Sequence, residues 1–476
     1  PIMAGRDFSS FIVYYNQFWD TNPVWHTAML YRTPITPLFI GGLYKLGGGL
    51  LLEVVLGLCF VASVLATYYL GTLFSRFIAI VAAITVAMFP TYGVMFHLLT
   101  SDNLFATFFI LWAAFISHTA RTPRLHHFVW HGVAVFMLVL VRPSAQTFLI
   151  FCLFPFLMSE WDTRKKLSAT VIFLGAALAL LFSWASYNYI RYDDFTVARG
   201  GAAQVPFYRV FVFDRLVQAD NGPASRTLAR AIESELLDKE PYRTYAPDAD
   251  VVLQSGDTRV WSDLAGMSDR VWGWDSDFKI LRQVALEAIG RHPWQYLKGV
   301  LYSSMYTFSE VVKPRAPTVG LYKRQRLAEE DETFVVDSGH IIPKSYQHWL
   351  ASNPEGSIRR RVERDMFDTD WYLPPDKIDL PPRDGSELLV KILNKFVTNV
   401  YPPMYVFLVL GAIGVMLSAN RFKWVLLFIG GMALLQVILT QVSVTLNIYY
   451  RTPFDPIFML LGIAGFIREG FRNTAH

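Results

Sequence analysis

The sequence is short of charged residues and of cysteine. Asp, Glu, Lys and Arg make up 17% of the 476 residues, against about 25% in soluble domains, and the formal net charge is only +4. The basic residues cluster at the ends of apolar runs, where membrane orientation explains them, so we expect no nucleic-acid partner. The two cysteines, Cys59 and Cys152, both lie inside apolar runs, which argues against a disulfide or a metal cluster.

Several common functional motifs are also missing. The chain has no phosphate-cradling glycine loop, no zinc-ligand spacing and no serine-nucleophile elbow, so soluble nucleotide chemistry is not indicated. It also has no Asn-x-Ser/Thr glycosylation site, which favours a bacterial envelope over a eukaryotic lumen.

Long apolar runs are abundant. Hydrophobic residues make up 53% of the chain and the mean hydropathy is +0.31. Nine runs are long enough, or nearly so, to cross a bilayer: 48–74, 77–97, 102–120, 127–141, 145–159, 167–190, 398–418, 423–444 and 454–468. The pattern predicts an all-α polytopic membrane protein. Because the runs 127–141 and 145–159 are short, one of them is a candidate for a broken or re-entrant segment.

The basic residues predict the orientation of these crossings. With the N-terminus outside, every cytoplasmic turn is basic, whereas the outer turns carry only two arginines among acidic and neutral residues. The inner basic residues are Arg76, Arg121, Arg124, Arg164, Lys165, Lys166, Arg421, Lys423, Arg468 and Arg472. The chain opens on Pro1 without a signal-peptide pattern, so an external N-terminus requires an upstream segment, which we expect to be a helix.

The same alternation of crossings places a polar insertion outside, and the chain then divides into four parts. We expect a first external loop with juxtamembrane helices at 1–47, about six crossings at 48–190, an α+β or mainly α extracytoplasmic insertion domain at 191–395, and about three crossings at 396–476. Within the insertion, the break at His292-Pro293 precedes an apolar stretch near 292–312 that we interpret as an interfacial helix. If this stretch spanned instead, Arg421 and Lys423 would face outward.

Three tryptophans of the insertion, Trp261, Trp272 and Trp274, are candidates for stacking on sugar rings. Packing in the core or anchoring at the membrane surface would explain them equally simply, and we prefer that interpretation.

The phrase Tyr-Arg-Thr-Pro-x-x-Pro occurs twice, at 31–37 and at 450–456, each time where a polar stretch enters an apolar run. A proline just inside a helix start leaves the other backbone N–H groups pointing outward, and an arginine beside them makes an anion site. The repeated phrase therefore places Arg32 and Arg451 at one membrane face, where we expect them to bind a lipid phosphate.

Three further residues on that face could take part in chemistry. Asp7, in an aromatic-rich segment, is a candidate general base, although a loop aspartate that caps a helix has the same pattern. Asp102 begins a crossing and could be its N-cap, or could orient an acceptor or hold a divalent cation. Arg142 ends a crossing and either extends to headgroups or joins Arg32 and Arg451 in neutralising a leaving phosphate.

These motifs, in this order, resemble the GT-C membrane glycosyltransferases, in particular the branch with the protein O-mannosyltransferases and the lipid A aminoarabinose transferases. The resemblance covers residues 1 to about 190 and about 396 to 468. The matching elements are the acidic Asp7 of the first loop, the Pro-rich entry Thr33-Pro34-Ile35-Thr36-Pro37-Leu38 with glycines 47 to 49 after it, Ser101-Asp102, Arg142-Pro143 and Tyr450-Arg451-Thr452-Pro453. The long insertion is a departure, and it leaves the acceptor unassigned.

The resemblance implies a GT-C-like helical bundle that transfers a sugar, with inversion, from a polyprenyl-phosphate donor to an extracytoplasmic glycan, lipid or protein. Asp7 would be the base, Asp102 would position the acceptor or support Asp7, and Arg142 and Arg451, with Arg32, would hold the donor phosphate. Nearby candidates for substrate contact are Tyr31, His97 and Tyr450. The resemblance specifies no cofactor, and a divalent cation is a candidate. A bacterial inner-membrane location is expected.

Two other classes stay open at this point. A transporter of lipid or envelope precursors is the main rival, but coupled transporters usually bury ionisable residues at mid-membrane, and the crossing interiors here contain almost none. A catalytically silent relative could instead use its outer domain as a scaffold. Loss of turnover on replacing Asp7 by Asn would separate an enzyme from both.

Overall fold

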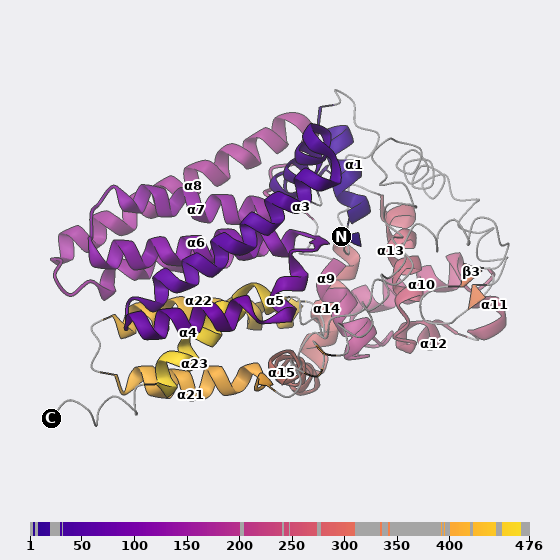
Figure 1. The fold of residues 1–476 in the computed structure, drawn as a ribbon. Coiled ribbons are helices and arrows are strands. Elements are labelled where there is room, and N and C mark those ends of the chain that lie inside the picture. Colours follow the sequence, from indigo (N-terminus) through magenta and orange to yellow (C-terminus); the bar gives the residue numbers. More distant parts are fainter. Residues whose placement is uncertain are drawn as a thin grey trace.

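The structure is a computed structural model. It describes residues 3–4, 8–19, 29–30, 32–199, 204–239, 242–246, 248–273, 278–309, 334–335, 341–342, 392, 395, 400–418, 422–443 and 450–467. These residues form an almost entirely helical protein, in which the apolar helices lie side by side and the polar helices gather at one end of the bundle (Figure 1). The predicted all-α polytopic fold is confirmed.

Nine apolar segments of the described chain make up the bundle. Four are long and apolar enough to cross a membrane by length and composition: α3 (Ile35–Gly71), α6 (Ser101–Arg121), α8 (Thr163–Tyr192) and α22 (Lys423–Ser443). The shorter ones are α4 (Arg76–Ala87), α7 (His127–Val141), η1 (Pro143–Leu157), α21 (Met404–Met416) and η5 (Thr452–Phe454) continued by α23 (Asp455–Phe466). The short helix α5 (Pro90–Met95) links α4 to α6.

The two short runs around Arg142 form two separate helices. α7 and η1 each have 15 residues, but η1 is a 3₁₀-helix. A 3₁₀-helix rises about 2.0 Å per residue, so η1 extends over about 30 Å, which matches the hydrocarbon core of a bilayer. The α-helix α7, at about 1.5 Å per residue, covers about 22 Å. The extended geometry of η1 therefore compensates for its small number of residues.

The longest helix, α3, is broken near its start. Its 37 residues would extend over about 55 Å if continuous, well beyond a bilayer core. The backbone leaves helical geometry at Gly47 and Gly48, and Gly48 has φ +65° and ψ −163°, a conformation that a side chain disfavours. The break separates an entry helix from a crossing of membrane length.

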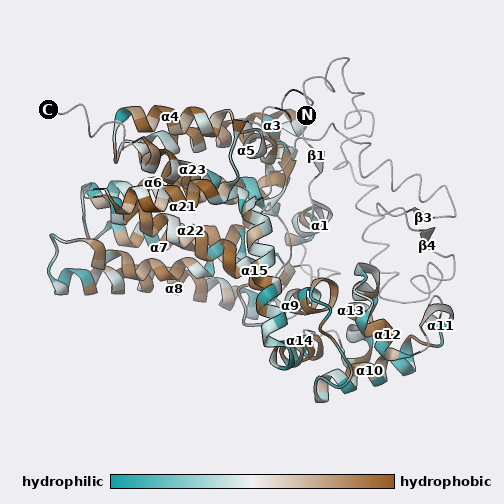
Figure 2. Ribbon diagram, turned by 90° about the horizontal axis from the view of Figure 1, so that it is seen from below, coloured by the Kyte–Doolittle hydropathy of each residue, from teal (hydrophilic) through white to brown (hydrophobic). Residues whose placement is uncertain are grey.

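The polar part of the chain forms a second unit with its own hydrophobic core. Its helices are α9 (Gln204–Tyr208), the π-helix η2 (Arg209–Phe213), α10 (Pro223–Glu235), α11 (Tyr242–Tyr245), α12 (Ala249–Gln254), α13 (Thr258–Trp272), α14 (Lys279–Arg291) and α15 (Pro293–Ser309). Figure 2 shows that these helices are more hydrophilic than the bundle. Trp261 and Trp272 pack against this core, in agreement with the preferred interpretation, and Trp274 lies outside the described residues.

Strands are few in the described chain. β1 (Met3–Ala4) pairs in parallel with β2 (Leu98–Leu99), and β3 (Phe334–Val335) pairs antiparallel with β4 (Ile341–Ile342). The first pair matters for the site, because Ala4 is opposite Leu99 and thereby holds the N-terminal segment beside the start of α6. The helix α1 (Phe8–Phe18) follows β1 and packs on α3, where the ring of Tyr15 occupies the space beside Gly41.

Candidate functional site

The start of α6 places Asp102 at the end of the bundle that faces the insertion. The N-cap of α6 is Thr100. Its backbone is extended, and its hydroxyl oxygen accepts a hydrogen bond from the backbone N–H of Asp102 at 3.2 Å. The interpretation of Asp102 as the N-cap is therefore wrong. Because Thr100 satisfies the helix end, the carboxylate of Asp102 is available for another partner, although the residue is only 5% exposed.

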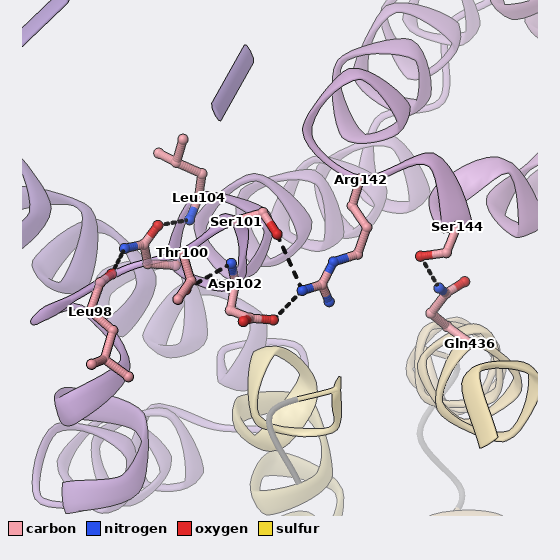
Figure 3. A network of polar contacts seen from close by, with 9 residues as sticks. Leu98, Thr100, Ser101, Asp102, Leu104, Arg142, Ser144 and Gln436 are labelled. Carbon is pink, nitrogen blue, oxygen red and sulfur yellow. Dashed lines mark hydrogen bonds and ion pairs between the residues drawn. The ribbon is translucent and has the colours of Figure 1, made fainter. Parts of the chain in front are cut away.

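Arg142 lies in the bend between α7 and η1. Its backbone is extended, with φ −149° and ψ 114°, as expected for a residue before proline, and its N–H closes α7 by donating to the carbonyl of Leu138 at 2.9 Å. Pro143 then begins η1. The sharp turn directs the arginine side chain across the end of the bundle towards α6 (Figure 3).

Arg142 and Asp102 form a buried ion pair. One guanidinium nitrogen of Arg142, Nη2, donates to the carboxylate of Asp102 and also to the hydroxyl of Ser101 at 3.4 Å (Figure 3). The two side chains are 12% and 8% exposed. Aromatic rings complete the enclosure, because the guanidinium carbon lies 5.2 Å from the ring centroid of Phe105 and 5.3 Å from that of Tyr450.

The guanidinium of Arg142 retains unused hydrogen-bond donors. Within the part of the chain that the structure describes, only Nη2 donates a hydrogen bond, and Nε and Nη1 have no hydrogen-bond acceptor. A guanidinium carries five N–H donors and binds phosphate oxygens in a bidentate manner. An arginine fixed by a carboxylate on one nitrogen can therefore present its other nitrogens to an anion.

A row of polar side chains extends from Arg142 towards α22. Gln436 of α22, 3% exposed, donates from its amide to the hydroxyl of Ser144 at 2.9 Å (Figure 3). It also accepts a hydrogen bond from the hydroxyl of Thr147. Its glutamine–serine bond fixes η1 against α22 and so supports the bend that carries Arg142.

Arg451 is held in a different way from Arg142. Its side chain is fully buried, and it donates to both carboxylate oxygens of Asp455, from Nε at 2.9 Å and from Nη2 at 3.3 Å. Nη1 donates to the backbone carbonyl of Thr307 in α15. The sequence reasoning missed Asp455 as a partner, although its i,i+4 spacing from Arg451 was a usable signal. In the first copy of the phrase, Thr36 occupies the corresponding position.

The structure joins some of the predicted site residues and leaves others apart. Asp102, Arg142 and Tyr450 are in contact, whereas the guanidinium of Arg451 points to Asp455 and Thr307. Arg32 lies at the entry to α3, with its guanidinium carbon 5.7 Å from the ring centroid of Phe11.

The remaining predicted residues lie at the N-terminal side of the site. His97 is exposed and directly precedes β2. Asp7 and Tyr31 fall outside the described residues, but the flanks of Asp7 are described: β1 ends at Ala4 and α1 begins at Phe8. No group of three or more His, Cys, Asp or Glu residues that could hold a metal occurs among the described positions.

The fold and the site together define a multi-pass membrane protein with an arginine–carboxylate centre at one end of its helical bundle. Residues 31–187, about a third of the chain, match the family described as dolichyl-phosphate-mannose-protein mannosyltransferase. Over this third, the chain is similar to membrane glycosyltransferases of the GT-C type. No curated protein and no solved structure matches the chain.

Proposed function

We propose that the protein transfers a sugar from a polyprenyl-phosphate donor to an extracytoplasmic acceptor, with inversion at the sugar carbon. The observation that carries this proposal is the guanidinium of Arg142, which Asp102 and two aromatic rings hold in place while Nε and Nη1 have no acceptor among the described residues. The matched family supports a lipid-linked sugar donor of this kind.

In the proposed reaction Asp7 is the general base. Its carboxylate takes the proton of the acceptor hydroxyl, the acceptor oxygen forms a bond to the anomeric carbon, and the bond from that carbon to the phosphate oxygen breaks. The electron pair remains on the departing phosphate. Attack from the face opposite the phosphate inverts the configuration. The pairing of β1 with β2 supports this assignment, because it fixes the chain three residues before Asp7 beside the start of α6.

Arg142 would stabilise the negative charge that develops on the departing phosphate. A donor that is already oriented before the reaction stabilises this charge without a reorganisation cost, and removing one such donor typically costs about 10²–10³ in rate. Asp102 is then a positioning residue, because it holds the guanidinium through Nη2. This assignment replaces the role in acceptor positioning that the family resemblance suggested for Asp102.

Arg451 and Arg32 would complete the phosphate site in different ways. Arg451 fixes the segment that carries Tyr450, whose ring lies against Arg142, so we assign Arg451 to shaping the site. Arg32, at the entry to α3, would contribute further positive charge. His97, Tyr31 and Tyr450 are proposed as substrate contacts. A divalent cation remains a candidate that the test below can examine by chelation.

We place the site on the extracytoplasmic side of a bacterial cytoplasmic membrane. Alternating crossings put Asp102 and Arg142 at one end of the bundle and the basic turn with Arg121 and Arg124 at the other. Basic turns usually face the cytoplasm. The insertion then lies outside, where it would select the acceptor.

The test incubates the purified protein with a panel of radiolabelled polyprenyl-phosphate sugars and envelope extract. The expected result is label in a new product with the native chain and none with Asp7→Asn. Arg142→Gln should lower turnover by at least 10²-fold. Asp220→Asn in an exposed turn of the insertion and Arg124→Gln at the opposite end of the bundle are the matched controls. Unchanged product formation by Asp7→Asn would refute Asp7 as the base, and no labelled product with the native chain would favour a transporter or a scaffold.

A further inference from the structure

Helix α15 lies crosswise to the bundle at the end that carries the site. In Figure 1 it is seen end-on while the bundle helices run across the view, and in Figure 2 it again runs across their direction. It packs against α21 and α22 on one side and continues from α14 of the insertion on the other. A helix in this position follows the plane of the membrane surface.

The inner face of α15 is fixed by two buried arginines. Arg209 of η2, fully buried, pairs with Asp214 at 3.0 Å and donates to the hydroxyl of Ser303 at 3.3 Å and to the backbone carbonyl of Gln441 in α22. One turn further along, the carbonyl of Thr307 accepts from Arg451.

Gly299, one turn before Ser303, leaves space for the carboxylate of Asp214, the partner of Arg209. A Cβ at Gly299 would lie 2.1 Å from Oδ1 of Asp214. The helix therefore links the insertion, through Arg209, to the C-terminal arginine phrase, through Arg451.

The opposite face of α15 is apolar and exposed. Four positions spaced three and four residues apart form a stripe along the helix, and Tyr302 widens it. Their exposed fractions are high: Trp294 79%, Leu297 44%, Leu301 57%, Tyr302 63% and Met305 70%. Lys298 is also exposed. Exposed apolar side chains at this density are typical of a surface that something covers.

The bilayer is the occupant that the surroundings favour. Helix α21, which packs against α15, also exposes apolar side chains, and its Val409 and Ile413 are 54% and 52% exposed. On a protein that crosses the membrane, this surface faces lipid. Tryptophan and tyrosine are enriched at membrane interfaces, and a lysine on such a helix extends to the headgroups.

We propose that α15 is a membrane-surface helix, with its Trp294–Met305 stripe in the headgroup and upper acyl layer of the leaflet on the side of the site. Contact with lipid then fixes the depth, relative to the bilayer, at which Ser303 meets Arg209 and Thr307 meets Arg451, because both contacts lie on one rigid helix. The proposal goes beyond sugar transfer and does not depend on it.

The experiment measures which environment surrounds α15. The two native cysteines, Cys59 and Cys152, are replaced by alanine, and nitroxide labels are attached at Leu301→Cys and Met305→Cys in vesicles of phosphatidylcholine and phosphatidylglycerol. Val409→Cys gives the lipid standard. Glu233→Cys, exposed on the insertion, gives the water standard. Collisions of the label with oxygen and with a water-soluble nickel chelate are then compared.

The expected result is oxygen accessibility close to that of Val409→Cys, with nickel accessibility at least threefold below that of Glu233→Cys. Nickel accessibility equal to the water standard would overturn the proposal. Low accessibility to both reagents would also overturn it, because the stripe would then be covered by another segment of this chain or by a second copy. Leu297→Cys repeats the measurement one turn away if either labelled variant fails to fold. Because the readout does not require turnover, its outcome is independent of the proposed reaction.

Discussion

The ion pair between Asp102 and Arg142 should show strong energetic coupling. The perturbations are Asp102→Asn, Arg142→Gln and the double variant, each of which preserves size while removing charge. In each single variant one charge stays at the buried site without its partner, and breaking a buried pair in this way costs about 3–5 kcal/mol. The double variant leaves no charge behind, so it should cost less than the sum of the two single changes.

A second pair on the same chain provides the comparison. Lys239 and Glu235 also form an ion pair, at 3.6 Å, but their side chains are 41% and 40% exposed. Solvent screens such pairs, and their coupling is typically about 0.2–1 kcal/mol. The buried pair is only 12% and 8% exposed, so we expect its coupling to exceed that of the surface pair by more than 1 kcal/mol.

The assay is the reversible unfolding of the purified protein in detergent, measured for both double-mutant cycles under identical conditions. The reasoning is refuted if the effects of Asp102→Asn and Arg142→Gln add to within about 0.5 kcal/mol, as they would for two independent sites. Strong coupling together with lost transferase activity in Asp102→Asn would support the positioning role of Asp102.

Three further predictions concern packing and pH. Gly462→Ala should destabilise the bundle by about 1–3 kcal/mol, because its Cβ would lie 2.3 Å from the ring of Phe407, whereas Gly431→Ala, with no atom within 4 Å, should be nearly neutral in thermal unfolding. Burial of Glu287 opposes its charged form, but hydrogen bonds from the N-terminus of α10 outweigh burial and lower its pKa. Glu287→Gln should therefore cost about 1 kcal/mol at pH 7 and progressively less as the pH falls below the usual carboxyl value of 4.5, and an undiminished cost at pH 3.5 in thermal unfolding would contradict this. Gly299→Ala should lower thermal stability by about 1–3 kcal/mol through its collision with the buried carboxylate next to it, and an unchanged midpoint would show that the insertion is not seated there.

The fold class could be predicted because membrane crossings depend mainly on local composition. Each apolar run is recognisable by itself, and the run predicted at 423–444 corresponds closely to α22, Lys423–Ser443. The boundaries were less certain where backbone geometry decides them. The sequence did not indicate that η1 would be a 3₁₀-helix, or that the first crossing would continue from an entry helix across the break at Gly48.

For the site, sequence reasoning proposed candidate residues but not the contacts between them. The alternation of crossings places Asp102 and Arg142 at the same end, yet 40 residues separate them, and nothing local specifies that they pair. The partner of Arg451 was accessible to local reasoning, since Asp455 lies one turn along the same helix. Of the alternatives for Asp102, the N-cap role was wrong, because a threonine and an aspartate two residues apart are both good caps and only the backbone angles decide between them.

The contact between α21 and α23 consists largely of glycine. A Cβ at Gly411 would lie 2.5 Å from the backbone nitrogen of Gly462, and one at Gly414 would lie 2.5 Å from the Cα of Gly465. At these two positions the backbones touch directly, and the ring of Phe407 fills the space beside Gly462. Since α23 is continuous with the turn that bears Arg451, this close contact ties the position of Arg451 to that of α21.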